Sequence, residues 1–156
     1  MSRTNSEMVK EFMKRFNQQT GRNIFSDDVE ILKLLAMRVD LIAEEYDELK
    51  TATDRFAQAL IQTGVLPAEC FLDVVDSLVD ILYVTYGFFH AFGIDGETAF
   101  KIVHRSNMTK VGIDGKPVFR ADGKVLKGEN YIPPDLTPVL DSYIEELGSM
   151  IRLTDA

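Results

Sequence analysis

Apolar residues recur every three or four positions over most of this chain, and that spacing predicts helices rather than strands. With 156 residues, the chain is long enough for one domain with a real hydrophobic core. We expect an all-α fold, an antiparallel bundle of about five helices with a long loop in the C-terminal half. The predicted helices cover 7–19, 27–50 with a shorter segment at 54–62, 67–91, 95–105 and 137–152. We expect one helical domain over 1–156, with the loop inserted at about 111–135.

Capping residues give the expected helix ends. Ser6 is the expected N-cap of the first helix, and Asp95 that of the fourth. Pro67 suits the first position of the third helix. Thr51 and Thr53 weaken the second helix, so a break is expected there.

The segment 111–135 has no helical periodicity. It contains two Asp-Gly pairs, Asp114-Gly115 and Asp122-Gly123, which are turn signals. Apolar residues on both sides of the second pair predict a small hairpin at best. A loop of this length is usually functional or disordered, and its aromatic residues and lysines favour function.

The composition limits the partners and the compartment. The formal net charge of −8 argues against nucleic acid or an anionic membrane as the main partner. No apolar run approaches the roughly 18 residues of a membrane-spanning helix. The single cysteine, Cys70, cannot form an internal disulfide, which fits a reducing compartment, and we expect a cytoplasmic protein.

Two acidic clusters stand out along the chain. In the second predicted helix, Glu45 and Glu48 share one face because they are one turn apart. In the third, Asp73, Asp76 and Asp80 also share a face. Apolar residues surround this second cluster and suggest a core helix, where unpaired charges would cost several kcal/mol. Because no lysine or arginine occurs in or near that helix, no local base is expected and a divalent cation is the expected partner.

These clusters suit phosphoanhydride hydrolysis, which needs neutralised phosphoryl oxygens and an activated water. Metal ions can supply both. The candidate ligands of Mg²⁺, with Mn²⁺ as a substitute, are Glu45, Glu48, Asp73, Asp76 and Asp80. The candidate catalytic carboxylates are Glu44, Glu48 and Asp80, and one of them would act as general base. The alternative is that both clusters are only solvated acidic faces.

The basic residues concentrate at the end of the fourth predicted helix and in the loop that follows. Lys110 and Lys127 are candidates to bind phosphate oxygens, and Asn107 to hydrogen-bond a base or sugar. Tyr131 belongs to the same loop, and Tyr83 could border a base-binding pocket near the aspartates. These five residues are the candidate substrate-binding set. Alternatively, the lysines only balance the acidic surface.

The acidic motifs resemble those of a known superfamily. Glu44-Glu45-x-x-Glu48, followed by Asp73-x-x-Asp76 and Asp80-Ile81-Leu82-Tyr83, resembles the all-α nucleoside triphosphate pyrophosphatases. These include the MazG-like proteins, dimeric dUTPases and phosphoribosyl-ATP pyrophosphohydrolase. The segments 106–110, 122–124 and 127–134 look like a phosphoribosyl-ATP-pyrophosphohydrolase-like branch of the MazG relatives.

The resemblance implies Mg²⁺-dependent hydrolysis of a nucleoside triphosphate to the monophosphate and pyrophosphate, with nucleotide-pool house-cleaning as a role. It implies a homodimer or homotetramer, metal ligation by the two acidic pairs, and substrate contacts from Asn107 and Lys110. Asp73 stands where the family usually has glutamate, so its part in ligation could pass to Asp80. Two alternatives remain open: hydrolysis of phosphoribosyl-ATP, and a non-catalytic helical oligomer that binds a nucleotide or a metal.

Overall fold

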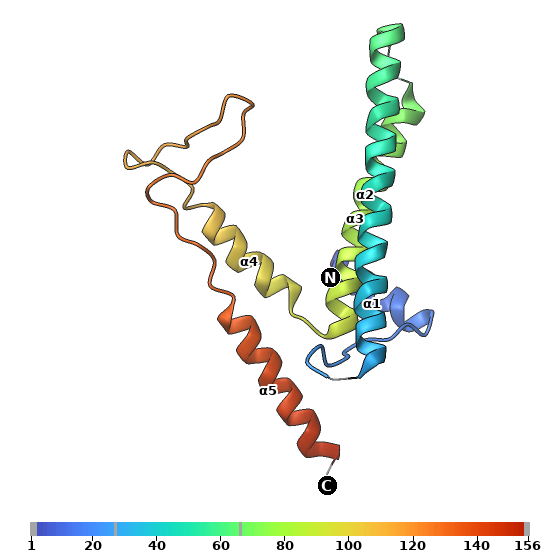
Figure 1. The fold of residues 1–156 in the computed structure, drawn as a ribbon, viewed down its shortest axis with the longest axis vertical. Helices are drawn as coiled ribbons and strands as arrows, with labels where there is room; N and C mark the ends of the chain where they lie inside the picture. The colour runs from blue at the N-terminus through green and yellow to red at the C-terminus, as the bar shows by residue number, and fades with distance from the viewer. Residues whose placement is uncertain (1–2, 27, 66, 155–156) are drawn as a thin grey trace. The chain divides into compact units, whose positions relative to one another are not determined.

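The computed structural model describes residues 3–26, 28–65 and 67–154, with side chains described as far as 148 (Figure 1). It contains five helices: α1 (Asn5–Arg15), α2 (Val29–Thr63), α3 (Ala68–Phe92), α4 (Gly96–Asn107) and α5 (Thr137–Thr154). The prediction of an all-α fold with about five helices is confirmed. The chain forms two compact units, Met1–Gly93 and Ile94–Ala156, which are described in turn.

Helix α1 begins earlier than the sequence predicted. Thr4 is its N-cap, and a capping box forms because Thr4 Oγ1 accepts from the Glu7 amide while the Glu7 carboxylate accepts from the Thr4 amide. The prediction that Ser6 caps this helix was wrong. Ser6 instead lies inside the first turn, with its Oγ 3.0 Å from His90 Nε2. This contact joins α1 to the last turn of α3.

Helix α2 is continuous, so the predicted break at Thr51 and Thr53 was wrong. Both threonine hydroxyls donate to main-chain carbonyl oxygens one turn earlier, Thr51 to Asp47 O and Thr53 to Leu49 O, each at 2.9 Å. A threonine that bonds back in this way is tolerated inside a helix. The helix ends at Thr63, and the next residue, a glycine, takes the left-handed conformation.

Helices α2 and α3 form a hairpin and lie side by side, and α1 packs against α3 (Figure 1). Helix α3 begins at Ala68, one residue later than predicted, and Pro67 is its N-cap rather than its first helical residue. The buried apolar side chains of this unit are Val9, Met13, Ile31, Leu34, Ala52, Ala91 and Phe92. Among the described residues, no single helix is long and apolar enough to cross a membrane, and only α3 and α4 taken together reach that threshold by length and composition.

The description of α3 as a core helix needs correction. Its apolar residues on one side are exposed to between 40% and 62%: Leu72, Val75, Leu78, Val79 and Leu82. Within one chain, α1 and α2 cover the rest of the helix and leave this stripe open. An exposed apolar stripe of this extent is typical of an interaction surface.

The second unit consists of α4, the long loop and α5. Asp95 caps α4 as predicted, since its carboxylate accepts from the Thr98 amide at 3.0 Å. The loop has the predicted hairpin, with an isolated antiparallel bridge between Phe119 and Val125, and the described residues contain no strand. Gly128 lies directly against the neighbouring loop segment, because a Cβ there would be 2.2 Å from the Val111 carbonyl oxygen.

Candidate active site

The acidic residues of α2 and α3 meet where the two helices face each other. Glu45 is half-buried, and its pKa responds to the charges of the neighbouring acids. Burial raises the pKa of the Glu45 carboxyl, and the negative charges of Asp80, Glu48, Glu44 and Asp76, in that order, raise it further. Two predicted ligand pairs from different helices therefore lie close enough to influence one proton. The acids of the two helices were expected to meet, although the helical spacing alone fixed only which of them share a face.

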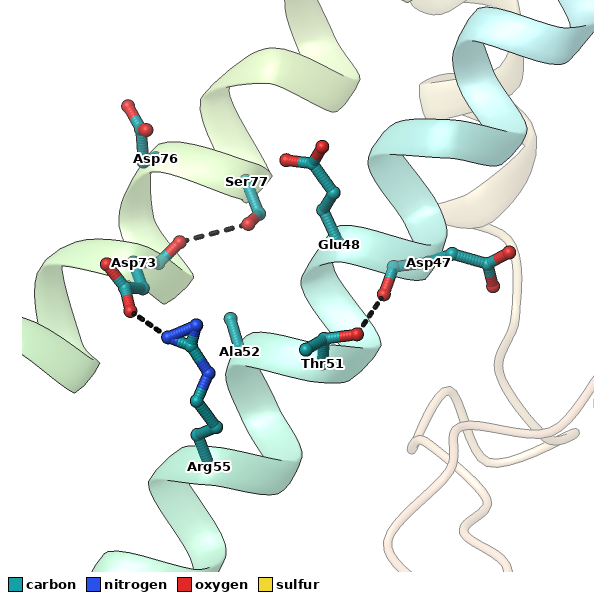
Figure 2. Close-up of a pocket in the computed structure, with 8 residues that line it drawn as sticks. All are labelled: Asp47, Glu48, Thr51, Ala52, Arg55, Asp73, Asp76 and Ser77. Carbon is teal, nitrogen blue, oxygen red and sulfur yellow. Dashed lines mark hydrogen bonds and ion pairs between the residues drawn. The ribbon is translucent and has the colours of Figure 1, made fainter.

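A polar cavity of about 450 Å³ opens between the two helices beside this cluster (Figure 2). Glu48 from α2 and Asp73 and Asp76 from α3 line it, and the Glu48 side chain points toward α3. Glu48 and Asp76 are exposed, whereas Asp73 is half-buried. The cavity is open to water, so these carboxylates lie less deeply than a core helix implied. Both partial burial and mutual repulsion act on the cluster, and at Glu45 burial is the larger of the two.

The expectation that the aspartates have no basic partner was also wrong. Arg55 reaches across from α2, and its Nη1 lies 3.1 Å from Asp73 Oδ2 (Figure 2). Both side chains are about half exposed, at 60% and 46%, so the pair contributes no more than about 1 kcal/mol. Its main consequence is positional, since it draws the Asp73 carboxylate toward Arg55. Asp76 points away from Arg55 (Figure 2).

The donor set of this cluster suits a hard divalent cation such as Mg²⁺. It consists of carboxylate oxygens, the ligands that Mg²⁺ prefers, and their charges are poorly balanced, as the raised pKa of Glu45 shows. Among the described residues, no three acidic, histidine or cysteine side chains already surround a common point. Four like charges repel one another when no cation lies between them, so a closed arrangement of ligands is not their resting geometry.

A second cavity, of about 390 Å³, lies on the other side of the cluster between α1, α2 and α3. Glu45 and Asp80 form part of its wall, so each cavity is lined by a different part of the acidic cluster. Tyr83 also lines it, and the Tyr83 ring contacts the Phe12 ring edge to face with centroids 5.4 Å apart. Tyr83 therefore borders a cavity that Asp80 also lines, as the sequence predicted. Glu44 is exposed and lines neither cavity.

The other candidate substrate residues lie in the second unit. Hydrogen bonding to Ser106 lowers the pKa of the Tyr131 phenol, and the charges of Lys127 and Lys110 lower it further. Lys127 Nζ lies 4.6 Å from the centroid of the Tyr131 ring, a cation–π contact. These residues therefore form one basic cluster. Asn107 is exposed at the last position of α4, and its carbonyl accepts from the Lys110 amide.

A family model described as phosphoribosyl-ATP pyrophosphohydrolase matches residues 9–107, which include the whole acidic cluster. The chain belongs to this family. It is thus a pyrophosphohydrolase of the MazG-like all-α superfamily, a hydrolase that acts on acid anhydrides. A comparison with curated proteins found no match.

Two arginines of this pyrophosphohydrolase were missed by sequence reasoning. Arg38 lies between Leu34 and Leu41 on the apolar face of α2 and is only 5% exposed. Its charge at a core position of an amphipathic helix could have marked Arg38 as unusual from the sequence. Arg55 lies two turns after Glu48 on the same face, but its partner on α3 depends on how the two helices are aligned. The sequence carries no comparable sign of that pairing.

Proposed function

We propose that this chain hydrolyses a nucleoside triphosphate at the α–β phosphoanhydride bond and releases the monophosphate and pyrophosphate. The acidic cluster of Glu45, Glu48, Asp76 and Asp80 supports this proposal most directly. These residues form one concentrated negative site within the matched family region. A negative site attracts a negatively charged triphosphate only when cations neutralise the carboxylates and the phosphates. Removal of unwanted nucleotides from the cellular pool is the role that we propose.

We propose Mg²⁺ as the cofactor, with Mn²⁺ as a substitute. Glu45, Glu48, Asp76 and Asp80 would hold it, and Asp73 would contribute less because Arg55 engages its carboxylate. When bound, the metal neutralises phosphoryl oxygens and lowers the pKa of water. Glu48 faces the open cavity and can accept a proton from an attacking water, and Asp80 and Glu44 are the other candidates for that part.

The basic cluster of the second unit is the proposed source of contacts to the remaining phosphate oxygens. Lys110 and Lys127 already lie near one phenol, so an anion arriving there would meet two ammonium groups. Asn107, at the end of α4, would hydrogen-bond the sugar or base, and Tyr131 would hold Lys127 in position. The family match ends at residue 107, so Lys110, Lys127 and Tyr131 lie beyond it.

We propose that the working enzyme is a homodimer or homotetramer in which a second copy covers the exposed stripe of α3. Leu72, Leu78 and Leu82 are 62%, 48% and 53% exposed, more than a folded protein usually leaves on one helix face. Obligate interfaces between copies resemble a domain core cut in half, and this stripe has that composition. A cytoplasmic location stays a prediction from the single cysteine.

A panel of nucleotides with pyrophosphate detection tests the function. The wild-type chain should release pyrophosphate, rather than phosphate, from at least one nucleoside triphosphate, and chelation should abolish the reaction. Glu48→Gln and Asp76→Asn should each lose most of this activity. Asp40→Asn is the matched control, because Asp40 is an exposed acid of the same helix outside the cluster. Absence of turnover across the panel, or full activity of both site variants, would refute the proposal.

Phosphoribosyl-ATP is the second candidate substrate, because the matching family model is described by that activity. The bond broken would be the same, so the acidic cluster serves either substrate equally. The panel should therefore include phosphoribosyl-ATP beside the common nucleotides. A rate constant for it at least about tenfold above those for all nucleoside triphosphates would favour this second candidate. Calorimetry that shows binding without turnover would instead indicate a nucleotide sensor.

A further inference from the structure

The cavity between α1, α2 and α3 contains a buried arginine whose charge no described carboxylate balances. Arg38 is 5% exposed, and burial lowers the pKa of its guanidinium with no opposing contribution. One terminal nitrogen donates to Gln18 Oε1 at 3.0 Å, but Arg38 Nε is buried and has no hydrogen-bond partner. The side chain lines the cavity, together with Gln18.

A purely structural role does not account for this arrangement. An unpaired buried charge is strongly unfavourable, and one hydrogen bond to a neutral amide offsets only part of that cost. The neighbouring helix also makes space for the group, because a Cβ at Gly87 would lie 3.1 Å from Arg38 Nη1. Glycine inside a helix is less favourable than alanine. Both features favour a ligand that uses the guanidinium.

The walls of the cavity suit a flat aromatic ligand. The rings of Phe12 and Tyr83 lie edge to face on one side, and Met13, Leu41 and Val84 supply apolar surface. Stacking on aromatic side chains favours binding of any nucleobase, because every base has a π-face. A phosphate group suits this cavity less well than a base. Two of its other lining residues, Glu45 and Asp80, are acidic, against one guanidinium.

The polar groups at the Arg38 end of the cavity determine which base would be preferred there, because the acceptors Glu45 and Asp80 belong to the acidic cluster. An arginine only donates hydrogen bonds. Gln18 Oε1 already accepts from Arg38, so the amide nitrogen of Gln18 is its free polar group, also a donor. Such a set matches a base edge with carbonyl oxygens, as in uracil, thymine or guanine. The amino group of adenine would place one donor against another.

We propose that Arg38 is a specificity-determining residue that binds the carbonyl-bearing edge of the substrate base. The proposal rests on nucleotide hydrolysis as the function and adds to it a preference for keto bases over adenine. Arg38 precedes Glu45 by two turns of α2, about 10 Å at 1.5 Å per residue. A base at Arg38 would therefore lie on the far side of the acidic cluster from the polar cavity that Glu48 and Asp76 line.

Calorimetry with α,β-imido analogues of dUTP and dATP, in the presence of Mg²⁺, tests the proposal without relying on turnover. The wild-type chain should bind the dUTP analogue at least about tenfold more tightly, because the adenine analogue leaves a buried donor unpaired. Arg38→Met should reduce this ratio to near one, mainly by weakening the dUTP analogue. Arg15→Met is the control, because it removes an exposed arginine of α1 outside the cavity, and it should leave the ratio unchanged.

Gly87→Ala provides a second test in case Arg38→Met does not fold. It improves helix propensity and pushes the guanidinium aside by a few tenths of an ångström, so it should lower the ratio in a stable protein. A ratio that stays at the wild-type value in either folded variant would overturn the proposal. So would an equal loss of both analogues, which would indicate a contact to the sugar or phosphates. Wild-type turnover without base preference would refute only this inference, whereas no turnover of any nucleotide would refute the proposed function.

Discussion

Neutralising Glu45 should change the stability of the protein in opposite directions with and without magnesium. The Glu45→Gln substitution keeps the size of the side chain and removes one charge from the acidic cluster, on which Glu44 also acts. In chelator, the variant should melt at a higher temperature than the wild type. In excess Mg²⁺, it should melt at a lower temperature, because it lacks one of the proposed ligands.

The size of the effect without metal follows from the charges around Glu45. Like charges one turn apart on a helix cost about 0.2–0.5 kcal/mol per pair, and Glu45 lies near four other carboxylates. Removing it should therefore stabilise the protein by about 1 kcal/mol, which corresponds to a rise in Tm of roughly 2–4 °C at this chain length.

The same reasoning gives the pH dependence without metal. The pKa of Glu45 is raised above its ordinary 4.5, so the folded state binds its proton more tightly than the unfolded state does. Wild-type stability should then decrease as the pH rises from about 4.5 through the raised pKa. Because the variant lacks this proton, its advantage over the wild type should grow over that window and be absent below it.

Magnesium should reverse the order. A ligand at a hundred times its Kd stabilises the native state by about 2.7 kcal/mol, a rise of roughly 5–10 °C. The variant should gain markedly less. Thermal unfolding followed by circular dichroism, in chelator and in Mg²⁺, measures both effects, with Asp40→Asn as the control that should respond to Mg²⁺ like the wild type. If Glu45→Gln melts lower in chelator, or gains as much from Mg²⁺ as the wild type, the reasoning about this cluster is wrong.

Two further predictions concern individual acids. Asp76→Asn should raise the Mg²⁺ concentration for half-maximal activity by at least about tenfold, which is the loss typical of mutating a residue that only supports a metal ligand. Asp73→Asn should raise that concentration less, because Arg55 already holds the Asp73 carboxylate. Equal effects of the two variants in a metal titration would contradict this. At neutral pH, Asp95→Ala should destabilise α4 by about 1 kcal/mol through loss of its N-cap. Hydrogen bonds from Thr98 lower the pKa of Asp95, so the stabilisation is present above the unfolded pKa and is lost as the pH falls through the lowered one. Melting curves of wild type and variant should therefore converge in acid, and a constant gap would refute the assignment.

Much of the fold followed from local properties of the chain. The period of apolar residues is a property of each segment, and it located α3, α4 and α5 to within about two residues. It failed where local competition was misjudged. The threonines of α2 were expected to break the helix. Their hydroxyls instead donate to carbonyl oxygens of the preceding turn, and the helix continues. At the start of α1, a capping box at Thr4 and Glu7 prevailed over the isolated serine cap.

The acidic side of the site was predicted from helical geometry alone. Residues one turn apart must share a face, so Glu45 with Glu48, and Asp73 with Asp76 and Asp80, were placed on common faces before any packing was known. That the two faces meet needed the hairpin of α2 and α3, which the structure supplies. The resemblance carried by the same residues gave the family, which the match to residues 9–107 confirmed.

Only the tertiary structure showed the two arginines and the open face of α3. Arg55 balances Asp73 because of the alignment of α2 against α3, and Arg38 lines a cavity that three helices form together. Neither the Arg55–Asp73 pair nor the cavity around Arg38 follows from sequence spacing, because each brings together residues of different helices through packing. The sequence determined which side chains each helix presents on each face; packing decided which of those charges find a partner, and which remain for a ligand.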